Sequence, residues 1–235
     1  RAAVEAARAE VARMDEEGRT VRHFHRRRDL MEELRGAYAG VLGVPTAEVA
    51  LTASTSEGLA RVLLGLDLAP GDEVLTARTE HPGLIAPLRA LQVKGVRVRV
   101  VDLADIADAV TDDTTIVACS HVDWISGKLA PTALADVDVP VLLDGAQGVG
   151  AIGSDLRALG CSAYAAPAQK WLCGADGTGL LWLEPGFAER VRPVMPTIWN
   201  LEDPTDGWTS PLKADAARHD TFSLAAEVLV TTLAS

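Results

Sequence analysis

The stretch SAYAAPAQKWLCGADGTGLLWL, residues 162–183, contains two apolar runs separated by a turn that carries one lysine. Short apolar runs bounded by glycine-rich turns are typical of buried strands. Lys170 directly follows the first run, and an isolated lysine is usually a solvated side chain, because burying its unpaired charge is costly. In a desolvated position the lysine would have a lowered pKa and would be a nucleophilic amine. Such an amine can form a Schiff base with a carbonyl compound.

On both sides of this stretch the chain alternates between apolar runs and helical patterns. Strands are expected near residues 46–54, 72–77, 96–102, 114–122, 139–147, 161–168 and 178–185. Helices are expected near residues 55–66, 81–95, 103–110, 131–137, 155–160 and 223–235. Repeated strand–helix–strand units with apolar strands predict an α/β fold, in which a mostly parallel central sheet is flanked by helices on both faces. Ligands of such sheets bind beyond the carboxyl ends of the strands, so the residues directly after each strand are candidates for a site.

The two ends of the chain differ from this middle part. Residues 1–45 are dominated by Ala, Glu, Arg and Leu, and they are expected to form an N-terminal helical segment that Gly18 interrupts. Residues 46–195 are expected to form a large ligand-binding domain. Residues 196–235 are expected to be a polar loop, rich in Pro, Asp and Trp, followed by the start of a helix.

The composition argues against several classes of protein. The 235 residues carry a formal net charge of −11, whereas nucleic-acid binding needs a basic surface. No apolar run approaches the roughly 20 residues of a membrane span, and the charged N-terminal pattern lacks the apolar core of a signal peptide. The three cysteines, Cys119, Cys161 and Cys173, form no CxxC pair. We therefore expect structural thiols, no metal site and a cytoplasmic location.

Hydroxyl groups and a ring follow the first two expected strands. Ser54, Thr55 and Ser56 stand at the start of a helix, where unpaired amide groups and the helix dipole favour a phosphate. Ordinary helix capping also explains these residues, and taken alone they favour it. His81, in TEHPG, could stack on a flat ligand ring or could simply cap the next helix.

A carboxylate and an amide follow the apolar strand that ends in LLD. Asp144 could form a turn, or it could pair with a protonated ring nitrogen. Gln147, three residues later, could donate a hydrogen bond to a phenolate oxygen. Lys170 completes the ordered set, and each member falls at a strand end.

This ordered set resembles the class V aminotransferase family of pyridoxal-phosphate (PLP) enzymes, of fold type I. The segments LLDGAQGVG (142–150) and AAPAQKWLCGADGTGLLWL (165–183) carry the resemblance most specifically. The family includes cysteine desulfurases, C–S lyases, kynureninase-like hydrolases and isopenicillin N epimerase-like proteins. A nucleotide-binding Rossmann fold is a poor alternative, because no GxGxxG follows the first strand.

The resemblance implies a role for each candidate. Lys170 would bind PLP covalently and move the α-proton of the substrate, Asp144 would pair with the pyridinium nitrogen, and His81 would stack on the ring. Gln147 would contact the phenolic oxygen. The phosphate would be held by Ser54, Thr55, Ser56 and Gln169. Thr221 would reach the phosphate bound by a partner subunit. The active sites would lie at the interface of a homodimer. A small C-terminal domain, which supplies the arginine for the substrate carboxylate, would follow residue 235.

Two departures from the family pattern bear on the reaction. Many desulfurases have Ser-x-His-Lys where this chain has PAQK, so that Pro167 and Gln169 replace the usual phosphate contacts. Trp124, in DWISG, stands where asparagine is common. These changes resemble the lyase or epimerase-like branch. We expect a C–S lyase or desulfurase-like β-elimination on cysteine or a cysteine derivative, with an aminotransferase, an epimerase or a non-catalytic remnant of the fold as alternatives.

Overall fold

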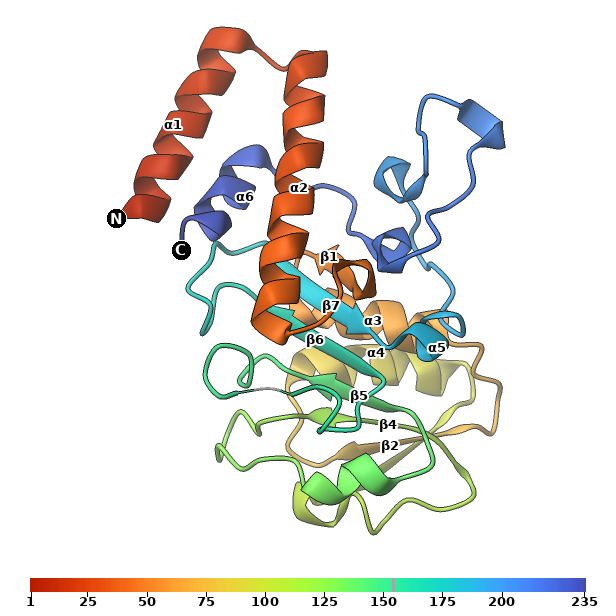
Figure 1. Cartoon of the computed structure of the whole chain (residues 1–235). Coiled ribbons are helices and arrows are strands. Elements are labelled where there is room, and N and C mark those ends of the chain that lie inside the picture. Colours follow the sequence, from red (N-terminus) through yellow and green to blue (C-terminus); the bar gives the residue numbers. More distant parts are fainter. Residues whose placement is uncertain (154) are drawn as a thin grey trace.

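A seven-stranded mixed sheet forms the centre of the computed structural model, which describes residues 1–153 and 155–235 (Figure 1). The strand order is β1-β7-β6-β5-β4-β2-β3, and β7 alone runs antiparallel to its neighbours β1 and β6. The strands are β1 (Val49–Thr52), β2 (Glu73–Ala77), β3 (Arg97–Val101), β4 (Thr114–Ser120), β5 (Val141–Asp144), β6 (Ala163–Pro167) and β7 (Gly179–Leu183). This arrangement confirms the α/β fold with a mostly parallel sheet.

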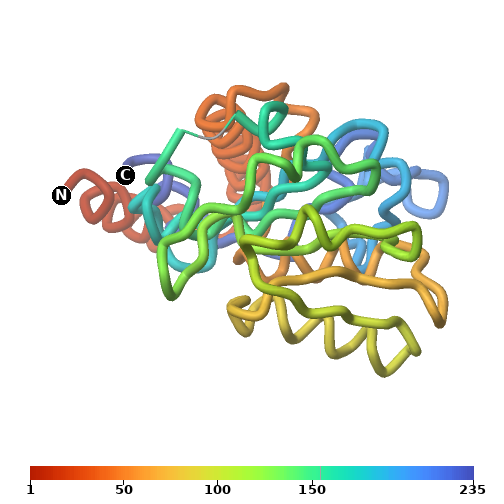
Figure 2. Tube along the Cα trace, turned by 90° about the horizontal axis from the view of Figure 1, so that it is seen from below, coloured from red at the N-terminus to blue at the C-terminus, as the bar shows by residue number. Residues whose placement is uncertain are grey.

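Helices cover both faces of the sheet, as Figures 1 and 2 show. One face packs on α3 (Thr55–Gly65) and α4 (Pro82–Val93), and the other packs mainly on α2 (Val21–Leu42). Of the remaining α-helices, α1 (Ala2–Glu17) packs on α6 (Ala226–Leu233), and α5 (Pro185–Ala188) is one short turn. Short 3-10 turns complete the chain at Thr46–Glu48, Leu103–Asp105, Thr132–Asp136, Ile198–Asn200, Gly207–Thr209 and Ala216–His219. No helix of the described residues has both the length and the apolarity needed to cross a bilayer.

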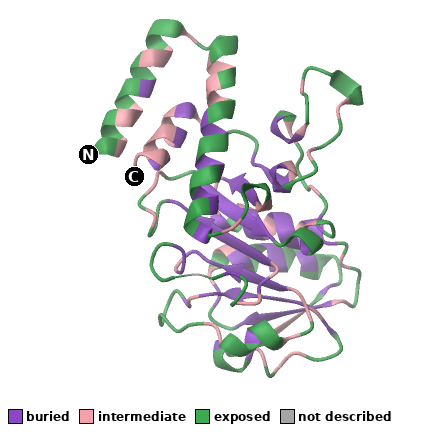
Figure 3. Cartoon of the chain, in the orientation of Figure 1, coloured by how far each residue is buried: buried purple, intermediate pink, exposed green. Residues whose placement is uncertain are grey.

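The central strands are buried along their whole length because they carry apolar residues toward both faces (Figure 3). The edge strand β3, in contrast, carries Arg97 and Arg99 and is only partly buried. Charged side chains on an edge strand discourage pairing with another chain. The sheet is therefore apolar at its centre and polar at the edge that β3 forms.

Two of the expected helices are absent, so those predictions were wrong. In 103–110 only the 3-10 turn Leu103–Asp105 forms. Leu103 and Ile106 are both buried, and their spacing of three residues suits one tight turn better than a longer α-helix. In 155–160 the Asp155 carboxylate caps a single turn by accepting from the amides of Arg157 and Ala158, and the turn ends at Gly160, which has a φ of +62°.

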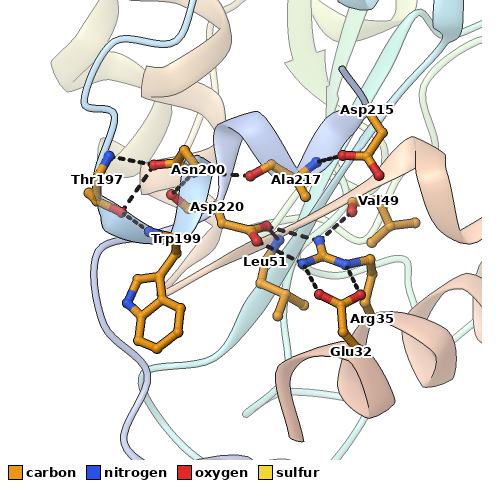
Figure 4. A network of polar contacts seen from close by, with 10 residues as sticks. All are labelled: Glu32, Arg35, Val49, Leu51, Thr197, Trp199, Asn200, Asp215, Ala217 and Asp220. Carbon is orange, nitrogen blue, oxygen red and sulfur yellow. Dashed lines mark hydrogen bonds and ion pairs between the residues drawn. The ribbon is translucent and has the colours of Figure 1, made fainter. Parts of the chain in front are cut away.

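The segment predicted as a polar loop is anchored to the sheet by a buried ion pair (Figure 4). Both guanidinium NH2 groups of Arg35 in α2 donate to the carboxylate of Asp220, at 2.9 and 2.7 Å. Arg35 also donates to the carbonyl of Val49, and the amide of Leu51 donates to Asp220, each at 2.8 Å. Arg35 and Asp220 are 2% and 0% exposed. The pair therefore ties the loop and α2 to strand β1.

A second group of polar contacts holds the same loop together. The side-chain amide of Asn200 donates to the carbonyls of Ala217 and Asp220, at 3.0 and 3.2 Å (Figure 4). Next to it, Trp199 stacks on Phe24 of α2, with ring centroids 4.8 Å apart. These contacts hold the loop against α2, although its only regular elements among the described residues are short 3-10 turns.

Candidate active site

The candidate residues follow strands that run in the same direction. Because β7 is antiparallel to both of its neighbours, β1 runs parallel to β6, and β6, β5, β4 and β2 are parallel to one another. Ser120, at the end of β4, pairs in register with Asp144, which pairs with Ala165. The turns after these strands therefore meet at one carboxyl edge of the sheet, as the sequence predicted for a site.

The start of α3 combines a capping serine with free amide groups. The Ser54 hydroxyl accepts a hydrogen bond from the Glu57 amide at 3.1 Å, and the Glu57 carboxylate accepts one from Ala53 at 2.6 Å. The first of these bonds shows that Ser54 has the ordinary role of a helix N-cap. The amides of Thr55 and Ser56 have no hydrogen-bond partner among the described residues, as expected in a first helical turn. They remain available to an anion.

The starts of α3 and α4 lie against each other. A Cβ atom placed on Gly83 would lie 2.2 Å from the Ser56 hydroxyl oxygen and 3.1 Å from Nδ1 of His81. An alanine at this position would have to displace the Ser56 hydroxyl. The turn that carries Ser56 therefore lies next to the turn that carries His81.

His81 is held by contacts on two sides. It caps α4, and its Nδ1 accepts a hydrogen bond from the Gly83 amide at 3.0 Å. In the neutral ring the proton is therefore on Nε2. The Trp124 ring meets His81 edge-on, at a centroid distance of 5.1 Å, and its indole N–H donates to the Thr79 carbonyl. The tryptophan at this unusual position thus packs against the candidate stacking ring.

Asp144 is a buried carboxyl whose hydrogen bonding is incomplete. It is 5% exposed, and Oδ1 accepts a bond from the Ala146 amide at 2.9 Å. Oδ2 has no hydrogen-bond partner among the described residues. Desolvation raises the pKa of Asp144, while the Ala146 amide and the positive charges of Lys170 and His81 oppose that rise. The environment therefore favours a further cation beside this carboxylate.

Gln147 has a partner that the sequence did not reveal. Its Oε1 accepts a hydrogen bond from the indole N–H of Trp171 at 3.0 Å. Trp171 directly follows Lys170, so this bond joins the turn after β5 to the turn after β6.

Lys170 is exposed, and the burial suggested by its apolar sequence context is wrong. The apolar residues belong to β6, which ends at Pro167, and both Gln169 and Lys170 lie in the bend that follows. Lys170 nevertheless lies close enough to Asp144 for its charge to act on that carboxyl. Cys173, on the same turn, is also exposed, whereas Cys119 and Cys161 are buried.

Thr221 is buried, unlike the residues that directly follow it in the loop. It is 5% exposed, and its amide donates to the Leu51 carbonyl at 2.8 Å. Two residues later, Ser223 is exposed and its hydroxyl accepts a hydrogen bond from Arg27 at 2.8 Å. The contact of Thr221 with a partner subunit stays a prediction.

Glu80 is a buried carboxyl at the site that the sequence analysis missed. It is 4% exposed, its Oε1 accepts from the Ser120 amide at 2.9 Å, and its Oε2 accepts from the Ser120 hydroxyl at 2.5 Å. Desolvation raises the pKa of Glu80 to about 7; the Ser120 bonds oppose this, and the charges of Asp144 and Asp123 add to it. The available signal was its position, directly before His81 and after a strand end.

The model of the family described as Aminotransferase class-V matches residues 1–205. A probable cysteine desulfurase of Methanothermobacter thermautotrophicus is 31% identical over 178 residues, which cover 70% of this chain and 44% of that protein. A probable cysteine desulfurase of Aeropyrum pernix is 31% identical over 179 residues, covering 69% and 43%. The chain thus spans less than half the length of these curated relatives.

Solved structures agree with the fold over nearly the whole chain. The cystine C–S lyase C-DES, in complex with its reaction product cysteine persulfide, superposes with a TM-score of 0.88 at 26% identity. A mutant of C-DES with glycine covalently linked to the PLP cofactor gives a TM-score of 0.88 at 25% identity. Each match covers 99% of this chain and 66% of the other.

Proposed function

Because the chain belongs to the class V aminotransferase family, we propose that it binds PLP and carries the catalytic lysine of an enzyme that cleaves a carbon–sulfur bond in cysteine or a cysteine derivative. The observation that carries the proposal is the buried carboxylate of Asp144, which has one unpartnered oxygen and lies within the electrostatic reach of Lys170 and His81. The relatives named as cysteine desulfurases and the neighbour named as a C–S lyase support the choice of sulfur chemistry.

The donor groups at this edge fit PLP. A pyridinium nitrogen would supply the positive charge that the buried carboxylate of Asp144 lacks. The free amides of Thr55 and Ser56, at the start of an 11-residue helix, suit a phosphate dianion. Oε1 of Gln147 is occupied by an indole N–H, which leaves the amide nitrogen to donate to a phenolic oxygen. The cofactor contacts of Ser54, Gln169 and Thr221 belong to the same proposal.

Each side chain has a defined task in this proposal. When bound, PLP supplies an electron sink for charge that develops at the substrate Cα. The Lys170 amine, exposed beside the site, accepts the proton from Cα and returns it. Asp144 holds negative charge where a ring cation is needed, and the Nε2–H of His81 is available as a donor. Loss of a thiol or persulfide from Cβ then gives elimination.

Two other reactions remain candidates, because Gln169 and Trp124 depart from the pattern of the standard desulfurases. Return of the proton to the opposite face of Cα would give an epimerase, and delivery of the proton to the cofactor would give an aminotransferase. Products distinguish the three reactions. Elimination gives pyruvate, ammonia and a sulfur species, epimerisation gives a racemised amino acid, and transamination gives a new keto acid together with a new amino acid. We also propose a cytoplasmic homodimer, supported by the free thiols and by the family resemblance.

The decisive experiment measures cofactor attachment separately from turnover, because the chain spans only part of its relatives. Protein mixed with PLP is expected to show a visible absorption band. Reduction with borohydride, digestion and mass spectrometry should then place the pyridoxyl label on Lys170. Lys170→Ala should lose both signals, whereas Lys128→Ala, which removes another exposed lysine, should keep both. A label on a different lysine, or no band at all, would contradict the proposal.

A further inference from the structure

The turns after β5 and β6 are in direct contact around Trp171. A Cβ atom on Gly150 would lie 2.9 Å from both the carbonyl carbon and the carbonyl oxygen of Trp171, and Gly150 has a φ of +78°. Only glycine allows this backbone approach without strain. The indole N–H of Trp171 then reaches across to Oε1 of Gln147, at 3.0 Å. One side chain thus joins the turn that carries Gln147 to the turn that carries Lys170.

The chemistry of the indole fixes which way the Gln147 amide faces. An indole nitrogen can only donate, so its partner must be the amide oxygen rather than the NH2 group. If the amide were reversed, its NH2 group would face the indole N–H and the bond would be lost. The nitrogen Nε2 has no protein partner among the described residues, and it is not sealed from solvent. The side chain is therefore held with its two donor hydrogens free.

We propose that Trp171 is a positioning residue, which holds the Gln147 amide so that its nitrogen, and not its oxygen, is presented to the phenolic oxygen of the cofactor. The inference rests on the proposed function, because that function gives Gln147 its ligand. Trp171 is 55% exposed, so packing alone does not account for its fixed contact. Phenylalanine at this position would keep the ring and lose only the donor.

The first test needs no cofactor. In isotope-labelled protein the side-chain amide resonance of Gln147, identified by its loss in Gln147→Leu, should move in Trp171→Phe. The matched control is Trp208→Phe, which alters a fully exposed indole that has no hydrogen-bond partner among the described residues. The same resonance should stay in place in that control. An unmoved resonance in Trp171→Phe would overturn the inference and would leave the proposed function intact.

The second test uses the PLP-loaded protein and follows the pH midpoint of its visible band. A donor to a phenolate stabilises the deprotonated form, so Trp171→Phe should raise the midpoint by roughly 1 pH unit. Gln147→Leu should raise it at least as far, and the double variant should match Gln147→Leu alone. A midpoint equal to that of Trp208→Phe, or additive shifts in the double variant, would refute the positioning role. If the wild-type chain formed no band, the proposed function would fail, and this role with it.

Discussion

Replacing Glu80 by glutamine is expected to stabilise the protein at alkaline pH and to leave its stability unchanged in acid. The Glu80 carboxyl is 4% exposed, and its pKa in the folded chain is about 7, against 4.5 for the free group. Glutamine has the same shape. Its Oε1 can accept from the Ser120 amide, and its Nε2 can donate to the Ser120 hydroxyl, so both hydrogen bonds survive.

The sign follows from the two protonation states. Below about pH 4.5 Glu80 is protonated in both the folded and the unfolded chain, and it contributes nothing to the pH dependence. Between pH 4.5 and about 7 the unfolded chain ionises first, so the free energy of unfolding falls as the pH rises. The pKa difference, at about 1.4 kcal/mol per pH unit, corresponds to a penalty of about 3 kcal/mol above pH 7. The glutamine variant avoids this penalty.

Urea unfolding of the cofactor-free protein, at intervals between about pH 5 and about pH 8.5, measures the effect. The free-energy difference between Glu80→Gln and wild type should grow from near zero to about 3 kcal/mol over this range. The control is Glu33→Gln, which removes an exposed carboxyl on α2 that makes no ion pair among the described residues. A difference that stays constant with pH would refute the reasoning.

Three further outcomes are expected. Arg35→Met should lower the free energy of unfolding by about 3–5 kcal/mol, because it leaves the charge of Asp220 buried without its partner; a loss below about 1 kcal/mol in urea unfolding would contradict this. Burial, followed by the charges of Arg218 and Arg61, lowers the pKa of His219 to about 4. The stability that this neutral ring contributes is present above pH 6.5 and is lost as the pH falls toward 4, so His219→Gln should show a flatter acid limb in the same assay. Gly83→Ala should weaken PLP binding in a fluorescence titration by displacing the facing serine of α3, whereas Gly36→Ala, where a Cβ meets nothing within 4 Å, should not.

The strands and the edge at which the site forms could be predicted because their signals are local. Runs of apolar residues marked the buried strands, and the polar residues after them marked the carboxyl edge. The helix expected at 103–110 failed, because two buried residues there satisfy the core with a single turn. The burial expected for Lys170 failed for a related reason: apolar neighbours in sequence belong to a strand that ends before the lysine.

The missed contacts depend on residues far apart in the chain. The hydroxyl that binds Glu80 lies 40 residues away, and the indole that binds Gln147 lies 24 residues away. The anchor of the C-terminal loop joins residues 185 positions apart. The spacing of residues in the sequence does not reveal such pairs, because only the folded sheet brings their strands and turns together. A charged residue shortly after a strand end, such as Glu80 after β2, is the feature of the sequence that comes closest to a local signal.

Two of the buried aspartates, Asp220 and Asp144, show how a structural acid differs from one that has room for a ligand. Asp220 meets both NH2 groups of a guanidinium and the amide of Leu51, so the fold itself supplies its cation and its donors. Asp144 is buried to nearly the same degree but receives one backbone amide, and the charges that act on it come from Lys170 and His81, which make no hydrogen bond to it. Burying a charge is costly unless a partner compensates it. Asp144 lies at the edge where the strand ends converge, and its charge is compensated less completely than that of Asp220. Under the proposed function, a protonated pyridine nitrogen would supply the missing compensation.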